Sequence, residues 1–361
     1  MSGKQSGLQL SHTHATQGAT TMQTTLPFGT TPSGQDAHLY LLESGDGMLV
    51  GVSDLGANLV CCHVPDGRGN FPDVTLGHAG AAGYVGDGYN LGAVVGRNAN
   101  RIAGARFEVA GSSYRLAANN GPNNLHSGPH KWSERLWKVA DADDDAVTFE
   151  LTSRKGDQGF PGSVQAQVTY RLTADHQLQV IYHAIPSEPT LINLTNHAYW
   201  NLNGHAAGSV LDHTLQIFAE SYTPLEAQIP TGAVEPVEGT PYDFREPRSI
   251  GACLDQLPSG YDDNFLLAGG TRLREAARLV GDQTGITMTV LTDSPALQIY
   301  TADYFDVPWA KGGVHYGAFA GIALETQYCP DAIHHKNFAQ PVFTPSRPFA
   351  HKTVFAFGTS A

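Results

Sequence analysis

Apolar and polar residues alternate with a period of two along much of this chain, and that pattern narrows the folds open to it. Residues 164–172 place Val164, Ala166, Val168 and Tyr170 on one side of an extended segment and polar residues on the other. Because successive side chains of a strand point to opposite faces, this pattern predicts a half-buried β-strand. The same alternation occurs at 146–153, 178–184, 214–219, 286–291, 296–301, 321–326 and 353–357. Strands separated by short turns predict an antiparallel sandwich or barrel.

Helical patterns are scarce. Residues 271–280 (TRLREAARLV) have good helix propensity. Gly and Asp then follow in GDQTG at 281–285, before another alternating segment, and this layout fits a β-hairpin equally well. We favour the hairpin.

The first 25 residues are polar and rich in Ser, Thr, Gln and Gly, so we expect a flexible N-terminal extension at 1–25. They contain no apolar core of about 7–15 residues, as a secretory signal needs. No stretch of the chain approaches the roughly 20 apolar residues of a membrane span. Residues 26–361 show no linker or internal repeat, and we expect them to form a single β-sandwich domain in the cytoplasm.

The charge of the chain argues against several kinds of partner. Lys and Arg number 21 and Asp and Glu 34, which gives a formal net charge of −13. With its basic residues scattered, the chain is expected to bind neither nucleic acid nor an anionic membrane surface. Sixteen histidines suggest zinc, but the HExxH and zinc-finger spacings are missing, as are the GxGxxG and P-loop patterns. We therefore expect no metal and no cofactor.

One histidine stands in a polar cluster inside a strand-like segment. His197 lies in NLTNHAYWNL at 193–202, between two amides and two aromatic residues. Histidine is the natural proton donor near neutral pH, because its unperturbed pKa is about 6.5. Tyr199 and Trp200 suit a sugar site, where flat rings pack against a pyranose. The alternative is a structural histidine beside core aromatics.

A glutamate interrupts the apolar strand pattern of GIALETQ at 321–327. Glutamate is almost never fully buried without a partner. If Glu325 faces inward, burial raises its pKa and makes it a better base. The alternative is an outward position at a strand end, and alternation does not decide between the two.

Other polar groups match the needs of sugar hydroxyls. Asn100 and Arg101 offer an amide and a fixed fork of donors. Asp262, in GYDDNF at 260–265, can accept hydroxyl hydrogens. Taken alone, each of these segments also reads as an ordinary surface turn.

Together the polar clusters resemble the aldose 1-epimerase (galactose mutarotase) family. The resemblance rests on GRNANRI at 96–102, NNLHSG at 123–128, NLTNHAYWNL at 193–202, YDDNF at 261–265, LQIYTA at 297–302 and LETQYCPDA at 324–332. It covers the chain from about residue 35 to the end. It implies an all-β fold, a large antiparallel twisted β-sandwich with few helices, with the sugar cleft across one sheet.

The resemblance also implies roles for individual residues. His197 would be the general acid and Glu325 the general base of ring opening. Sugar-binding positions would be Asn100, Arg101, His126, Asp262 and Gln298. The implied partner is a free monosaccharide such as galactose or glucose, bound by a monomer or homodimer without a cofactor.

Two alternative functions stay open, and the chain departs from the family's usual sequence at one position. A hexose-6-phosphate 1-epimerase has a related fold, and a non-catalytic sugar-binding domain could use the same scaffold. The family commonly has Asp-His-Asn-Phe where this chain has Asp262-Asp263-Asn264-Phe265. We expect Asp263 to alter the edge or polarity of the pocket.

Overall fold

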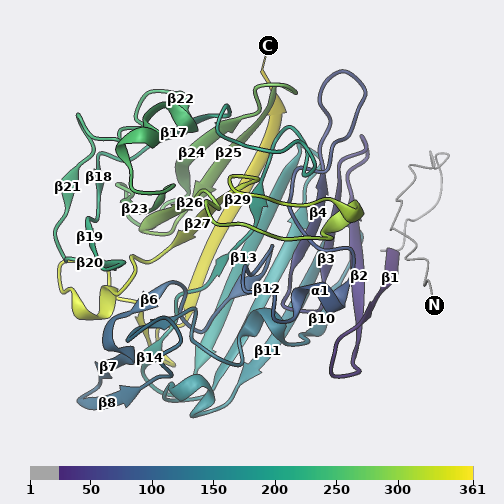
Figure 1. Cartoon of the computed structure of the whole chain (residues 1–361). Coiled ribbons are helices and arrows are strands. Elements are labelled where there is room, and N and C mark those ends of the chain that lie inside the picture. Colours follow the sequence, from purple (N-terminus) through teal and green to yellow (C-terminus); the bar gives the residue numbers. More distant parts are fainter. Residues whose placement is uncertain (1–23, 361) are drawn as a thin grey trace.

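The computed structural model describes residues 24–360, and most of the alternating segments pair into three antiparallel sheets (Figure 1). The extension expected over residues 1–25 lies outside the described residues, except for Thr24 and Thr25. These two residues begin the first strand, β1.

The largest sheet has nine strands and contains the long segments with the clearest alternation. Its order is β10 (Lys138–Ala142), β11 (Ala146–Ser153), β12 (Val164–Leu172), β13 (Gln177–Pro186), β29 (Phe349–Thr359), β25 (Ile286–Thr292), β24 (Arg274–Val280), β17 (Thr214–Ile217) and β22 (Arg248–Ser249). Figure 1 shows the C-terminal strand β29, in yellow, running through the middle of the sheet beside β13. Residues 271–280 contain no helix: β24 pairs with β25, so the favoured hairpin is confirmed.

A second sheet of six strands packs against the first. Its order is β16 (Tyr199–Trp200), β27 (Ile322–Gln327), β26 (Ala296–Tyr300), β23 (Asp262–Leu266), β18 (Ser221–Tyr222) and β21 (Glu235–Pro236). Ile322 and Leu324 share one buried cluster with Val180 and Phe355 of the nine-stranded sheet. The Trp200 ring lies with its centroid 4.8 Å from that of Phe355. This face-to-face core confirms the predicted all-β sandwich.

The N-terminal segments add a third sheet beside these two. It contains β1 (Thr24–Thr30), β2 (Asp36–Glu43), β3 (Leu49–Ser53) and β4 (Leu59–His63) in sequence order. Short pairs complete the strands: β5 (Val94–Val95) with β15 (Thr195–Asn196), β6 (Arg101–Ile102) with β9 (Asn124–Leu125), β7 (Arg106–Val109) with β8 (Ser112–Arg115), β14 (Thr190–Leu191) with β28 (Val342–Phe343), and β19 (Leu225–Glu226) with β20 (Ile229–Pro230).

Helix is rare in the described part of the chain, as predicted. It contains the short α1 (Ala81–Tyr84) and six 3₁₀ turns, at Ala103–Ala105, Trp132–Glu134, Asp157–Gly159, Ile250–Gln256, Lys311–Gly313 and Ala332–His334. Within residues 24–360, none of the helices has the length and apolarity to cross a membrane.

Candidate active site

Three neighbouring strands bring polar side chains together on the outer face of the six-stranded sheet. Asn264 of β23 is paired with Gln298 of β26, which is paired in turn with Glu325 of β27. Residues directly opposite each other in a sheet point to the same face. The face of β27 that carries Ile322 and Leu324 is turned to the nine-stranded sheet. Glu325 is therefore turned away from that core, and it is buried all the same.

His197 sits on the short connection between β15 and β16, and the backbone around it is tightly held. Its N–H donates to the Ala93 carbonyl, and its own carbonyl accepts from the Gly92 N–H. Gly92 has φ +68°, and a Cβ there would lie 2.0 Å from the Leu59 carbonyl oxygen. Only glycine fits this position, so the local sequence fixes where the imidazole emerges.

These side chains line one cleft. Six of the seven predicted site residues are on its wall: Asn100, Arg101, His126, His197, Asp262 and Glu325. The seventh, Gln298, does not line the cleft. It lies behind Asp262 and donates from Nε2 to the Asp262 Oδ1 at 2.7 Å.

His197 and Glu325 face each other at the base of the cleft. His197 Nε2 lies 3.5 Å from Glu325 Oε1, and both side chains are buried. Burial lowers the pKa of His197 to about 4, because the charged imidazolium loses its hydration. Burial also raises the pKa of Glu325 well above its usual value, and the negative charge of Asp262 adds to this shift. Both shifts favour a pair in which His197 is neutral and Glu325 holds a proton.

A second histidine lies next to the first. The His126 and His197 rings are 5.5 Å apart, edge to face. His126 Nδ1 accepts the backbone N–H of Asn100 at 3.2 Å, and burial lowers the pKa of His126 well below 6.5. A neutral imidazole that accepts at Nδ1 carries its hydrogen on Nε2. His126 is thus a hydrogen-bond donor on the cleft wall.

Arg101 and Asp262 form an ion pair on the cleft wall that further side chains hold in place. Arg101 Nη1 lies 3.5 Å from Asp262 Oδ2, while Arg101 Nε donates to Asn120 Oδ1 at 3.0 Å. Arg101 Nη2 also donates to Gln228 Oε1 at 3.3 Å. With Gln298 on its other oxygen, Asp262 is held from two sides. This arrangement presents a fixed carboxylate and a fixed guanidinium to any sugar hydroxyl in the cleft.

Two expectations about the site are corrected by strand geometry. Trp200 follows Tyr199 in β16 and so points to the other face, where it packs in the core against Phe355. Tyr199 alone of this pair lines the cleft.

Asp263 follows Asp262 in β23, so its side chain points to the other face of the sheet. It is buried and does not line the cleft. Its Oδ2 accepts the Asp262 N–H at 3.1 Å. Asp263 therefore does not form the pocket's edge, while its effect on the polarity of the pocket stays a prediction.

Several lining residues were not predicted from the sequence. Tyr300 lies two positions after Gln298 in β26, so alternation could have placed it on the same face. Tyr304 and Lys131 also line the cleft, but both lie in loops, where no periodic signal exists. Tyr304 is 68% exposed and forms part of the rim.

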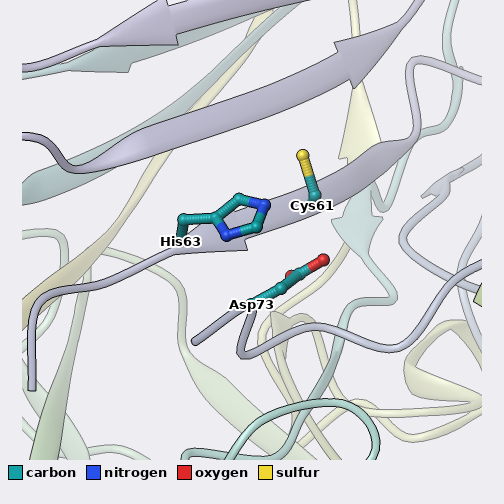
Figure 2. A group of neighbouring side chains, drawn as sticks. All are labelled: Cys61, His63 and Asp73. Carbon is teal, nitrogen blue, oxygen red and sulfur yellow. The ribbon is translucent and has the colours of Figure 1, made fainter. Parts of the chain in front are cut away.

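Figure 2 shows a separate group of possible metal ligands, Cys61 and His63 on β4 with Asp73 on the following loop. Their ligand atoms lie within 4.8 Å of one another. The Asp73 carboxylate already holds Lys311, whose Nζ lies 2.5 Å from Oδ2 and also donates to the carbonyls of Val60 and Thr75. The positive charge at this place is therefore supplied by a lysine, which a metal ion would have to displace.

Comparison with known proteins agrees with this geometry. A family model described as aldose 1-epimerase matches residues 38–356. The aldose 1-epimerase of Escherichia coli K12 is 36% identical over 335 residues, which cover 90% of this chain and 96% of that protein. The human galactose mutarotase is 37% identical over 336 residues, covering 92% of this chain and 98% of that protein.

Solved structures share the fold. A GalM/aldose epimerase homologue from C. elegans superposes with a TM-score of 0.85 at 28% identity, covering 90% of this chain and 100% of that one. A galactose 1-epimerase from Lactobacillus acidophilus gives a TM-score of 0.81 at 25% identity, covering 94% of this chain and 100% of that one. Sequence and fold together show that this chain belongs to the aldose 1-epimerase family and is an isomerase.

Proposed function

We propose that this enzyme interconverts the α and β anomers of free aldohexoses such as galactose and glucose, with His197 as general acid and Glu325 as general base. The observation that carries the proposal is the buried contact of 3.5 Å between His197 Nε2 and Glu325 Oε1 in the cleft. The human relative's name, galactose mutarotase, supports galactose as one substrate.

The contact suits the reaction because both proton transfers occur at oxygens bound to one carbon. Ring opening removes a proton from O1 and delivers one to the ring oxygen O5. Both oxygens are attached to C1, so the base and the acid must be close neighbours. The aldehyde then rotates about the C1–C2 bond, and the ring closes on its other face with the transfers reversed.

The proton count of the pair is constant through this cycle. A protonated His197 and an ionised Glu325 carry one transferable proton, and after ring opening that count is unchanged, with His197 neutral and Glu325 protonated. In the cleft without sugar, burial favours this second state. Ring opening therefore starts from the less favoured arrangement of the proton on the pair, and ring closure restores that arrangement without exchange with solvent. The route consumes no electrons, phosphate or water, so it requires no cofactor.

The remaining cleft residues would hold the sugar. Asp262 and Arg101 are held in place by each other and by Gln298, and they would bind hydroxyls. His126 offers an Nε2 donor near His197. We also propose that the enzyme acts in the cytoplasm. Its four cysteines, Cys61, Cys62, Cys253 and Cys329, are all free thiols, as is usual in a reducing compartment.

Polarimetry on freshly dissolved α-D-galactose and α-D-glucose tests the function. We expect the protein to speed the approach to anomeric equilibrium with at least one of the two sugars, and Glu325→Gln to abolish the effect. Failure of the wild-type protein to accelerate either sugar would overturn the proposal.

A further inference from the structure

Lys131 is a cation on the cleft wall that the proposed mechanism does not use. It lines the cleft together with His126, His197 and Asn119. Among residues 24–360 no carboxylate forms an ion pair with it. Arg101, the other basic residue on the described wall, is already engaged by Asp262, Asn120 and Gln228.

The segment that carries Lys131 is anchored in the core. The next residue, Trp132, is fully buried and packs edge to face on Trp137, with ring centroids 5.7 Å apart. Ser133 Oγ then donates to Asn90 Oδ1 at 3.1 Å, and Asn90 itself lines the cleft. These contacts fix the backbone on this side of Lys131, whose side chain lines the cleft.

Lys131 shares its part of the cleft wall with the two histidines. It follows His126 in the loop after β9, and the His126 ring lies edge to face with the His197 ring, with centroids 5.5 Å apart. In a pyranose the ring oxygen is flanked by C1 and C5. If Glu325 faces O1 and His197 faces O5, the substituent next beyond O5 is the group on C6.

We propose that Lys131 recognises a carboxylate on C6, so that the enzyme also mutarotates hexuronates such as D-galacturonate; this rests on the proposed function. A single unpaired ammonium matches a monoanionic carboxylate. A phosphate dianion calls for more cationic donors than the wall provides, because Arg101 is committed elsewhere.

The carboxylate would also offset a cost that Lys131 imposes on catalysis. A positive charge near His197 opposes its protonation, which the general acid needs. A bound carboxylate beside Lys131 neutralises that charge. An acidic sugar thus gains twice, in binding and in the fraction of His197 that is protonated.

The test compares kcat/KM for D-galacturonate, D-galactose and D-glucose 6-phosphate, measured by polarimetry or NMR, in wild type and Lys131→Met. We expect Lys131→Met to lower the galacturonate-to-galactose ratio about tenfold or more, because a charge-assisted hydrogen bond is lost. Lys131→Arg should keep most of the ratio. Lys138→Met, which removes an exposed lysine of β10 outside the cleft, is the matched control and should leave the ratio unchanged.

The outcomes separate the two proposals. Turnover of galactose with no turnover of galacturonate, or an unchanged ratio in Lys131→Met, overturns the role of Lys131 and leaves the mutarotase intact. A larger effect of Lys131→Met on glucose 6-phosphate than on galacturonate overturns the carboxylate in favour of a phosphate. Absence of turnover with every sugar overturns the proposed function itself, and thermal melts confirm that each variant is folded.

Discussion

His197 and Glu325 perform complementary halves of one proton exchange, so we expect the loss of either group to stop turnover. His197→Asn and Glu325→Gln should each lower kcat by about 10²–10⁴-fold, the usual contribution of a positioned acid or base. Polarimetry gives the rate, and circular dichroism confirms the fold. His183→Asn, at an exposed position of β13, is the matched control. Near-wild-type rates in either cleft variant would remove that residue from the mechanism.

The pH dependence of kcat/KM follows from the same pair. Activity needs one transferable proton on the pair. As pH falls through the lowered pKa of His197, about 4, both groups become protonated and no base remains. We expect the acid limb near that pH, well below the value for an unperturbed histidine. Burial is the main cause of the shift and Lys131 adds to it, so Lys131→Met should move the acid limb to higher pH. An acid limb at about pH 6.5, the ordinary histidine value, would contradict this protonation scheme.

At the scale of elements, the segment at 96–102 depends on Arg97, a fully buried cation that does not line the cleft. Its Nη1 donates to the Pro161 carbonyl and its Nη2 to Ser153 Oγ, both at 2.7 Å. Arg97 therefore ties this segment, and with it Asn100 and Arg101, to the ends of β11 and β12. Lysine cannot reproduce the planar fork of donors.

We accordingly expect Arg97→Lys to lower the free energy of unfolding by on the order of 3 kcal/mol, since several buried acceptors lose their donor. Urea unfolding measures this loss, and Arg272→Lys on an exposed turn is the matched control. Equal midpoints for the two variants would show that the Arg97 contacts are replaceable.

Asp263 ties the stability of the whole molecule to pH. Burial, followed by the charge of Asp262, raises the pKa of Asp263 to about 7, whereas an unfolded Asp titrates near about 3.9. Between these values the folded state keeps a proton that the unfolded state releases, so this group's contribution to stability falls as pH rises. The difference in free energy of unfolding between Asp263→Asn and wild type should therefore shift in favour of the variant by on the order of 3 kcal/mol as pH rises from about 4 to about 8. Denaturant unfolding of both proteins across this range measures the gain, and a constant difference would show that Asp263 does not titrate there.

The single domain expected over residues 26–361 stays a proposal. It is supported by one buried cluster that draws on all three sheets, from Leu42 in β2 to Phe357 in β29. Such a shared core is typical of a unit that folds together.

Strands such as β12, and the hairpin of β24 and β25, could be predicted from the sequence alone, because alternation and turn residues are local properties of the chain. Six cleft residues could be named because their motifs resemble a family, although nothing local showed that they meet. The burial of Glu325 in the cleft, on the face of β27 turned away from the core, could not be predicted, since both faces of β27 are buried and alternation distinguishes faces but not their surroundings. Lys131 could not be predicted either, because a loop has no period. Both positions depend on contacts between distant segments, which come together only when the sheets pack.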